Sequence, residues 1–365
     1  MGKAVTDENS PAQSLFRFSP GQTLKPLAAS RPGSAPPSCT WAQTSAADLS
    51  WIWAAQAAKR GVIIVYSPLP RLEGQALHHW CTRLEKIIVP WLSPLQLNHL
   101  QCFGSSDAAL KARCSRLLAR ALLIRLVMAA AHAAMITRGE ADGAKSLQQQ
   151  PDIDSHMAWL SLNGLDMDYL GRPVMPGWRA AFSHSGQAAF CAAFHLGKEG
   201  EHSPCHQGNE APGSDAQQDF RPCLAVDAES LFNPPPAPRA YSSKEMVAPI
   251  AKESKIRDAL RRWTIKEALL KSAGLGLSRD PALVHSGFSG QRRGRAQFCH
   301  EGTTGFAIDG SSASRAAPCR QIGWQLIPCA EHWLCVAAPV LPDRPLLVTG
   351  RPLRAHWSGI LHTLG

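Results

Sequence analysis

The pattern of apolar and polar positions predicts helices in two separate parts of the chain. Ser93 opens a helical stretch, and in residues 108–135 apolar side chains recur every three to four positions, with Arg on the opposite face. A second helical pattern runs from about residue 254 to residue 273. It stops at Gly274, a residue type that commonly ends helices.

Short apolar runs bounded by Gly, Pro and polar residues predict strands between and after these helices. The clearest is the run GVIIVYS at residues 61–67, which is rich in β-branched side chains. Further strands are expected at residues 157–162, 187–196, 223–226, 323–328 and 333–338. Residues 341–365 show no obvious periodic element and are treated as a C-terminal tail.

The order of these elements predicts an α+β fold made of two similar halves, at residues 46–196 and 223–340. Residues 1–45 are rich in Ser, Pro, Gly, Ala and Thr and have no period, which predicts a disordered tail. Residues 197–222 are polar and Gly-rich, and they predict a flexible insertion on the surface.

Composition and charge narrow the classes of protein to which the chain can belong. Apolar residues make up 45% of the 365 residues, which is enough to bury a sizeable core. Lys and Arg outnumber Asp and Glu by 38 to 28, giving a net charge of +10. This charge excludes an acidic solvating protein and favours a polyanionic ligand or an acidic partner. The longest apolar run, residues 126–135, is too short to span a bilayer, so no membrane association is expected.

The 11 cysteines fall singly along the chain, with no Cys-x-x-Cys pair. A disulfide scaffold and an ordinary zinc site are therefore not expected. Cys329, His332 and Cys335 are close in sequence but fit strands better than a metal site. Free thiols in this number suit a reducing compartment, and we expect a soluble cytoplasmic protein.

Three short stretches carry candidate chemistry. Residues 183–185 (Ser-His-Ser) precede an apolar strand, residues 227–229 (Asp-Ala-Glu) follow another, and residues 263–271 (WTIKEALLK) lie inside the second predicted helix. Each stretch alone is commonplace. Ser-rich tetrapeptides form turns, Asp-x-Glu is typical of a solvated strand end, and Lys-Glu is typical of an exposed helix face.

Taken together, the stretches predict a site for a metal-bridged pyrophosphate. Side chains alternate along a strand, so Asp227 and Glu229 share one face and repel each other unless a cation lies between them. Hard oxygen ligands of this kind suit Mg²⁺. Glu267 and Lys271 are four residues apart and share a helix face. Glu267 can thus supply a third carboxylate to the metal, while Lys271 reaches a phosphate.

In this order the stretches resemble the signature of the 4′-phosphopantetheinyl transferase superfamily, in its longer Sfp-like branch. That signature reads Gly-Lys/Arg-Pro, then Ser-His-Ser, then a hydrophobic residue with Asp-x-Glu, then Trp-x-x-Lys-Glu-Ala closed by a Lys. The matching residues here are 171–173, 183–185, 226–229 and 263–271. The resemblance is good over residues 160–277 and looser over residues 90–340.

The resemblance implies two pseudo-symmetric α+β halves with the active site in the cleft between them. It implies transfer of the 4′-phosphopantetheine group from coenzyme A to a Ser of an apo acyl or peptidyl carrier protein, with release of adenosine 3′,5′-bisphosphate. Such carriers serve lipid or secondary-metabolite biosynthesis. Carrier proteins of this kind are acidic where they dock, which the basic charge of this chain would match.

The resemblance also implies a role for each candidate residue. Asp227, Glu229 and Glu267 would hold Mg²⁺ against the pyrophosphate. Glu267 is the expected base for the carrier Ser, directly or through a metal-bound water, and Lys271 and His184 complete the catalytic set. The residues expected to contact phosphates of coenzyme A are Arg172, Ser183, His184 and Lys271.

The sequence departs from the family signature in four places, one of which is Leu117 after Arg116, where the family has a Thr. Ala225 replaces the usual Gly before the Asp, and residues 197–222 are longer than the usual connection. The family's cationic residues for the 3′-phosphate are not matched at residues 95–100. Either coenzyme A binds weakly, or Arg113 and Arg116, three apart on one helix face, hold this phosphate, with Lys111 as a further candidate.

Two alternatives stay open. A degenerate member of the family would bind coenzyme A without transferring its arm; the retained carboxylates argue against this, and the altered N-terminal residues argue for it. A basic nucleic-acid-binding protein has only its net charge in its favour, because no binding motif or interleaving of aromatic and basic residues occurs. Nucleic acid is therefore not an expected partner.

Overall fold

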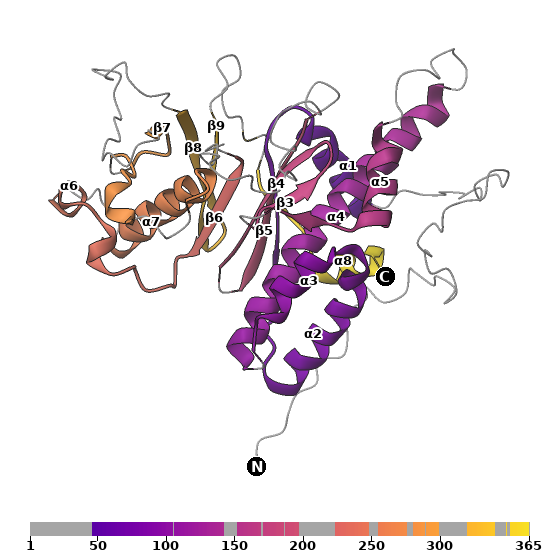
Figure 1. The fold of residues 1–365 in the computed structure, drawn as a ribbon, viewed down its shortest axis with the longest axis horizontal. Coiled ribbons are helices and arrows are strands. Elements are labelled where there is room, and N and C mark those ends of the chain that lie inside the picture. The colour runs from indigo at the N-terminus through magenta and orange to yellow at the C-terminus, as the bar shows by residue number, and fades with distance from the viewer. Residues whose placement is uncertain are drawn as a thin grey trace, which may run out of the picture.

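The structure is a computed structural model. It describes residues 46–104, 106–141, 152–168, 171–185, 187–196, 223–247, 255–275, 280–288, 290–298, 320–339, 348 and 351–364. These residues form a mixed α+β fold with one six-stranded and one four-stranded sheet (Figure 1). The α+β class is thus confirmed. The tail at residues 1–45 and the insertion at residues 197–222 lie outside the described residues.

The six-stranded sheet has the strand order β10-β1-β5-β4-β3-β2. Its strands are β1 (Ile63–Pro68), β2 (Asp166–Met167), β3 (Pro173–Met175), β4 (Trp178–Ser185), β5 (Ala188–His195) and β10 (Leu353–Arg354). Neighbouring strands are antiparallel, except that β1 and β10 are parallel. The hairpin of β4 and β5 therefore places the Ser-His-Ser stretch at the end of a central strand.

The four-stranded sheet has the order β6-β9-β8-β7 and is antiparallel throughout. Its strands are β6 (Ala225–Ser230), β7 (Arg293–Phe298), β8 (Arg320–Cys329) and β9 (His332–Pro339). A short turn joins β8 to β9, as the sequence predicts, and it places Ala330 at a φ of 48°. Cys329, His332 and Cys335 are strand residues, also as expected.

The three predicted helical stretches are helices, and the described residues contain further helices that the sequence pattern did not predict. The helices are α1 (Ala46–Ala58), α2 (Gly74–Ile88), α3 (Pro94–Gln101), α4 (Asp107–Ala141), α5 (Asp152–Asn163), α6 (Ser243–Val247), α7 (Lys255–Ser272) and α8 (Trp357–Leu364), with 3₁₀ turns η1 (Val89–Trp91), η4 (Pro238–Ala240) and η6 (Pro281–Leu283). The predicted ones are α3, α4 and α7. The side chain of Ser93 accepts from Gln96 N–H and caps α3. Gly274, at a φ of 70°, follows the end of α7.

Two expectations about secondary structure are wrong. Residues 157–162 were expected as a strand but belong to α5, because a short apolar run does not distinguish a buried helix from a strand. No regular element was expected in residues 341–365, yet β10 and α8 lie there. A two-residue strand and an eight-residue helix are too short to show a period. Trp357 of α8 meets Trp80 of α2 edge to face, with ring centroids 5.6 Å apart.

Helix α4 forms the centre of the larger core. Among the described residues, it contains the one helical span, Asp107–Ala134, that is long and apolar enough to cross a membrane. However, 83% of its most apolar window is buried inside the protein. The helix packs against β4 and β5 and against α1 and α2. Its apolar character is therefore accounted for by the core.

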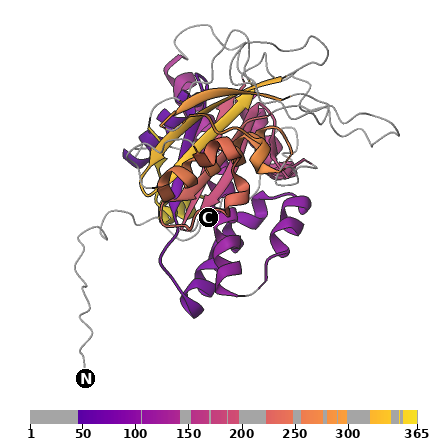
Figure 2. The same ribbon diagram turned by 90° about the vertical axis from the view of Figure 1, so that its left-hand side faces the viewer.

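The two sheets pack against each other through a second core. Phe190 and Ile64 of the larger sheet meet Val226, Leu334 and Val336 of the smaller one. Helix α4 covers the outer face of the larger sheet and α7 that of the smaller, so that the layers run helix, sheet, sheet, helix. Figures 1 and 2 both show α2 and α3 (purple) extending below the sheets. The strands β4 and β6 lie side by side at the junction.

A buried ionic network holds α7 to the segments around it. The fully buried Lys266 donates from Nζ to Glu245 Oε2 at 2.7 Å and to the carbonyl oxygens of Ala240 (3.0 Å) and Pro281 (2.9 Å). Ser286 N–H donates to Glu245 Oε1 at 3.1 Å. Burial would raise the pKa of Glu245, but the hydrogen bonds and charge of Lys266 lower it to about 2. The Lys-Glu sequence of the helix is thus not a simple exposed pair.

Removing one partner of this network should strongly destabilise the fold. Lys266→Met removes the closest cation from the buried Glu245 carboxylate and leaves only Arg262 Nη1, 3.8 Å from its Oε1. Loss of one partner of a buried ion pair amounts to about 3–5 kcal/mol. The double variant Lys266→Met/Glu245→Gln should recover part of the loss, because no uncompensated charge is left behind. Urea unfolding followed by circular dichroism measures both variants. A loss below about 1 kcal/mol in the single variant, as for an exposed pair, would contradict the assigned role.

Candidate metal and phosphate site

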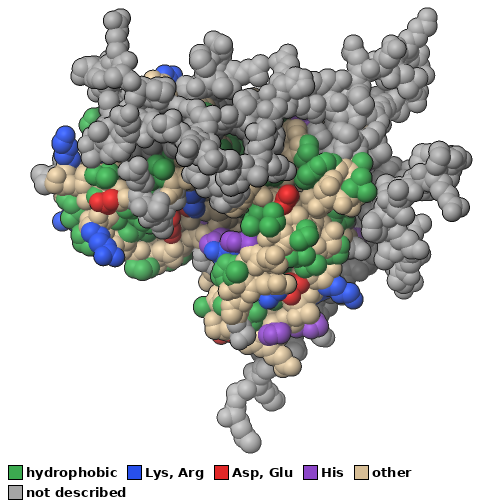
Figure 3. All heavy atoms as spheres, in the orientation of Figure 1, with side chains coloured by type: hydrophobic (Ala, Val, Ile, Leu, Met, Phe, Trp, Pro, Cys, Tyr) green, Lys and Arg blue, Asp and Glu red, His purple; other side chains and the backbone are tan. Residues whose placement is uncertain are grey.

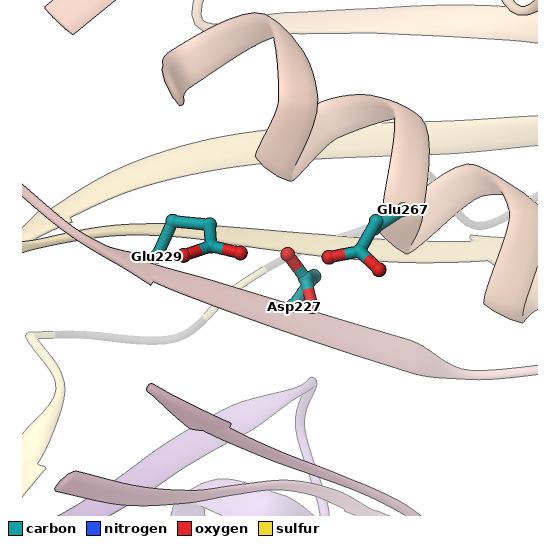
Figure 4. A group of neighbouring side chains, drawn as sticks. All are labelled: Asp227, Glu229 and Glu267. Carbon is teal, nitrogen blue, oxygen red and sulfur yellow. The ribbon is translucent and has the colours of Figure 1, made fainter. Parts of the chain in front are cut away.

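Three carboxylates from two elements meet on the face of β6 that α7 covers. Asp227 and Glu229 come from β6 and Glu267 from α7, and one carboxylate oxygen from each lies within 4.8 Å of the other two (Figure 4). Alternation along the strand directs Asp227 and Glu229 to the same side, as the sequence predicts. No other cluster of possible metal ligands of this size occurs in the described part of the chain.

Asp227 is the most buried of the three, with 2% of its surface exposed. Its Oδ1 forms an ion pair with Lys271 Nζ and accepts a long hydrogen bond from Ser183 Oγ at 3.4 Å. Its Oδ2 is buried and has no hydrogen-bond partner among the described residues. An unpaired buried carboxylate oxygen is costly, and a metal ion between the three side chains would satisfy it.

Glu229 and Glu267 are harder to ionise than ordinary glutamates. Burial and the negative charge of Asp227 raise the pKa of both, that of Glu267 to about 8. Asn233 Nδ2 donates to Glu229 Oε2 at 2.8 Å and opposes the shift there. Without a metal, Glu267 therefore keeps its proton at neutral pH, and a hard divalent cation between the three side chains would favour the ionised form of all of them.

Lys271 is the cation that faces this cluster. Burial would lower the pKa of Lys271, but the charges of Asp227 and Glu267 raise it above its ordinary value. The ammonium is therefore charged at neutral pH. Its side chain is 41% exposed, so it can also face an anion in solvent.

His184 lies on the opposite side of β4 from its serine neighbours. Its side chain is exposed, and it lies near helix α4 and Lys271. Partial burial and the positive charges of Arg116, Lys271 and Arg120 lower the pKa of His184 to about 4. The imidazole is therefore neutral at pH 7 and offers one N–H to an anion. Figure 3 shows His and basic side chains at the surface where the two halves meet.

The arginines of α4 divide between two surroundings. The Arg116 guanidinium lies over the Phe103 ring, 4.3 Å from its centroid, and its positive charge lowers the pKa of His184. Arg113 Nε instead lies 2.8 Å from Glu85 Oε1 of α2. Lys111 Nζ is 3.9 Å from an oxygen of the exposed Glu73. The structure thus brings Arg116 toward the Ser-His-Ser strand but does not join Arg113 or Lys111 to it.

Arg120 also belongs to this region, although it lies outside the sequence motifs. It is buried, with 4% exposed, and its Nε donates to Gln96 Oε1 at 2.6 Å. Its guanidinium lies 5.5 Å from the Phe182 ring centroid, and its charge contributes to the lowered pKa of His184. The only sequence signal for Arg120 is its position one helical turn after Arg116.

Arg172 lies near the segment that leads into β6. Its Nε and backbone N–H both bind the carboxylate of Asp168, the latter at 2.9 Å. Burial would lower the pKa of Arg172, but Cys223 and Asp168 raise it. Cys223 N–H donates to Ser272 O at the end of α7, at 2.9 Å. Arg172 is therefore placed beside the strand and the helix that carry the carboxylates.

The chain matches no model of a known protein family, and no curated protein is significantly similar to it in sequence.

Neutralising Glu267 should stabilise the protein in the absence of metal. Because the pKa of Glu267 in the fold, about 8, lies above its ordinary value of 4.5, ionisation destabilises the fold increasingly as the pH rises between these values. In chelator at pH 8, Glu267→Gln should be more stable than the wild type by at least about 1 kcal/mol, since one pKa unit corresponds to about 1.4 kcal/mol. At pH 4 the two should be equal.

The matched control for this measurement is Glu73→Gln, because the side chain of Glu73 is 86% exposed. It should leave stability unchanged at both pH values. A Glu267→Gln variant that is less stable than the wild type at pH 8 would show that the ionised carboxylate is favourable there, contrary to the raised pKa.

Proposed function

We propose that the protein is a 4′-phosphopantetheinyl transferase, which moves the 4′-phosphopantetheine arm of coenzyme A to a Ser of an acidic apo carrier protein. The observation that carries the proposal is the meeting of Asp227, Glu229 and Glu267 with Lys271 beside the Ser-His-Ser strand. In this proposal the two halves are pseudo-symmetric and the reaction takes place between them. The motif resemblance supplies the identity of the transferred group.

The donor set fits Mg²⁺. Three carboxylates lie within reach of one ion, and the buried Asp227 Oδ2 has no partner among the described residues. Asp227, Glu229 and Glu267 would hold the ion, which when bound neutralises the pyrophosphate and the leaving adenosine 3′,5′-bisphosphate. Lys271 adds positive charge on the same side.

The chemistry required of the chain is one proton transfer and the binding of anions. The carrier Ser oxygen forms a bond to the phosphorus that bears the pantetheine arm, and the bond from that phosphorus to the adenosine-side phosphate oxygen breaks. Glu267, directly or through a metal-bound water, would accept the Ser proton. The leaving bisphosphate takes the electron pair of the broken bond.

The remaining phosphates of coenzyme A require groups outside the carboxylate cluster. His184, neutral at pH 7, would donate its N–H, while Arg172 would add charge near the start of β6. Arg116 stands on the α4 side of His184 and is the best-placed cation for the 3′-phosphate. Arg113 is already paired with Glu85, which favours Arg116 over it.

Transfer should depend on divalent metal and on the carboxylates. With coenzyme A, Mg²⁺ and candidate acidic apo carrier proteins, the intact mass of the carrier should rise by one phosphopantetheine group. Asp227→Asn and Glu267→Gln should each reduce the rate by at least about 100-fold, the loss of a group that stabilises transition-state charge. Glu73→Gln serves as control and should be fully active. Undiminished transfer in chelator, or by Glu267→Gln, would refute the metal-assisted mechanism.

The 3′-phosphate contact can be assigned by comparing two ligands. Arg116→Gln should weaken coenzyme A more than dephospho-coenzyme A, by about ten- to a hundredfold, because a charge-assisted phosphate contact contributes about 1.5–3 kcal/mol. Arg113→Gln, which disrupts the pair with Glu85, should leave the ratio of the two dissociation constants unchanged. Isothermal titration calorimetry gives both constants. An unchanged ratio in Arg116→Gln would remove Arg116 from the site.

A further inference from the structure

We propose that Ser183 and Ser185 are positioning residues that fasten the carboxylate strand β6 to β4 and thereby set the geometry of the metal-binding carboxylates. The inference rests on the proposed metal site and assigns these two serines a role other than direct contact with phosphate. Both side chains are buried, each with 4% of its surface exposed.

The topology leaves one edge of β6, and part of one edge of β4, without a backbone partner among the described strands. Strand β6 is an edge strand of its sheet, bonded on one side by β9. Strand β4 is bonded by β5 along its length, but β3 pairs only with Trp178 and Arg179 at its start. The second half of β4 therefore has no described backbone partner on that side. Backbone N–H groups of a buried edge need acceptors from elsewhere.

The serine hydroxyls supply these acceptors. Ala228 N–H donates to Ser183 Oγ at 3.0 Å, and Ser230 N–H donates to Ser185 Oγ at 2.6 Å. The two bonds join residues with the same sequence separation of 45, so β4 and β6 run parallel and in register. Serine side chains of β4 thus accept hydrogen bonds from the backbone N–H groups on the free edge of β6.

The bonds act on the peptide groups that follow the carboxylate residues. Ala228 N–H belongs to the peptide after Asp227, and Ser230 N–H belongs to the peptide after Glu229. Fixing the peptide plane that follows each carboxylate residue restrains the direction of its side chain. Ser183 also donates its hydroxyl hydrogen to Asp227 Oδ1, at 3.4 Å. That hydrogen is then not directed at a phosphate.

The experiment measures binding of Mn²⁺, as a probe of the carboxylate site, to the full chain by electron paramagnetic resonance. Ser183→Ala and Ser185→Ala should each weaken Mn²⁺ about tenfold or more, the usual effect of losing a group that orients a metal ligand. Ser185→Thr keeps the hydroxyl and should restore affinity. The control is Ser67→Ala, a fully buried serine in β1 whose hydroxyl bonds only to the adjacent Pro68 carbonyl among described residues. It should bind as the wild type does.

A second measurement separates positioning from phosphate contact. In chelator, both alanine variants should bind coenzyme A as tightly as the wild type does, because neither hydroxyl faces a phosphate. Weaker binding by Ser183→Ala alone would overturn the inference in favour of a phosphate contact. Tight Mn²⁺ binding by the wild type and by both alanine variants would overturn the positioning role while leaving the metal proposal intact. If the wild type bound no Mn²⁺, the proposed metal site would fail, and the inference with it.

Discussion

Repulsion among three carboxylates at the junction of the two sheets is the constraint on which the arrangement of the site depends. Asp227, Glu229 and Glu267 are held within 4.8 Å of one another, and the pKa of Glu267 is raised to about 8 as a result of burial and of this crowding. Such a cluster persists only where the backbone that carries it is fixed from outside. Lys271 supplies partial charge compensation, and the packing of α7 on β6 supplies the restraint.

Helix α7 meets this requirement by placing its two motif lysines in opposite surroundings. Lys266 is fully buried and is bound by Glu245 and two backbone carbonyls, so it anchors the helix. Lys271 is partly exposed and faces the carboxylates, so it remains able to meet an anion. Because Glu267 directly follows Lys266 in the sequence, the anchored residue and the candidate base share a peptide bond. The rigidity of the first thereby limits the movement of the second.

The carboxylate cluster could be predicted from the sequence because it depends only on the side-chain repeat of a strand and that of a helix. A separation of two along a strand and of four along a helix determine which faces carry Asp227, Glu229, Glu267 and Lys271. The function of the serines could not be predicted in this way. Which backbone groups of β6 lack a partner depends on how the two sheets meet, and this is a tertiary property. Likewise, Glu85 on α2 captures Arg113, although helical spacing alone allows Arg113 and Arg116 to act together.

Strand β10 has a topological consequence for the molecule as a whole. It pairs with β1 at the edge of the larger sheet, where Ala355 N–H also donates to Tyr66 O at 2.8 Å. Helix α8, which follows β10, packs on α2 and α4. The smaller sheet, residues 225–339, is therefore inserted between two parts of one discontinuous unit. Both ends of the inserted unit are tethered to the larger sheet, which restricts its rotation more than a single linker would. During synthesis, the larger unit cannot be completed until residues 353–364 leave the ribosome, after the inserted unit has already emerged.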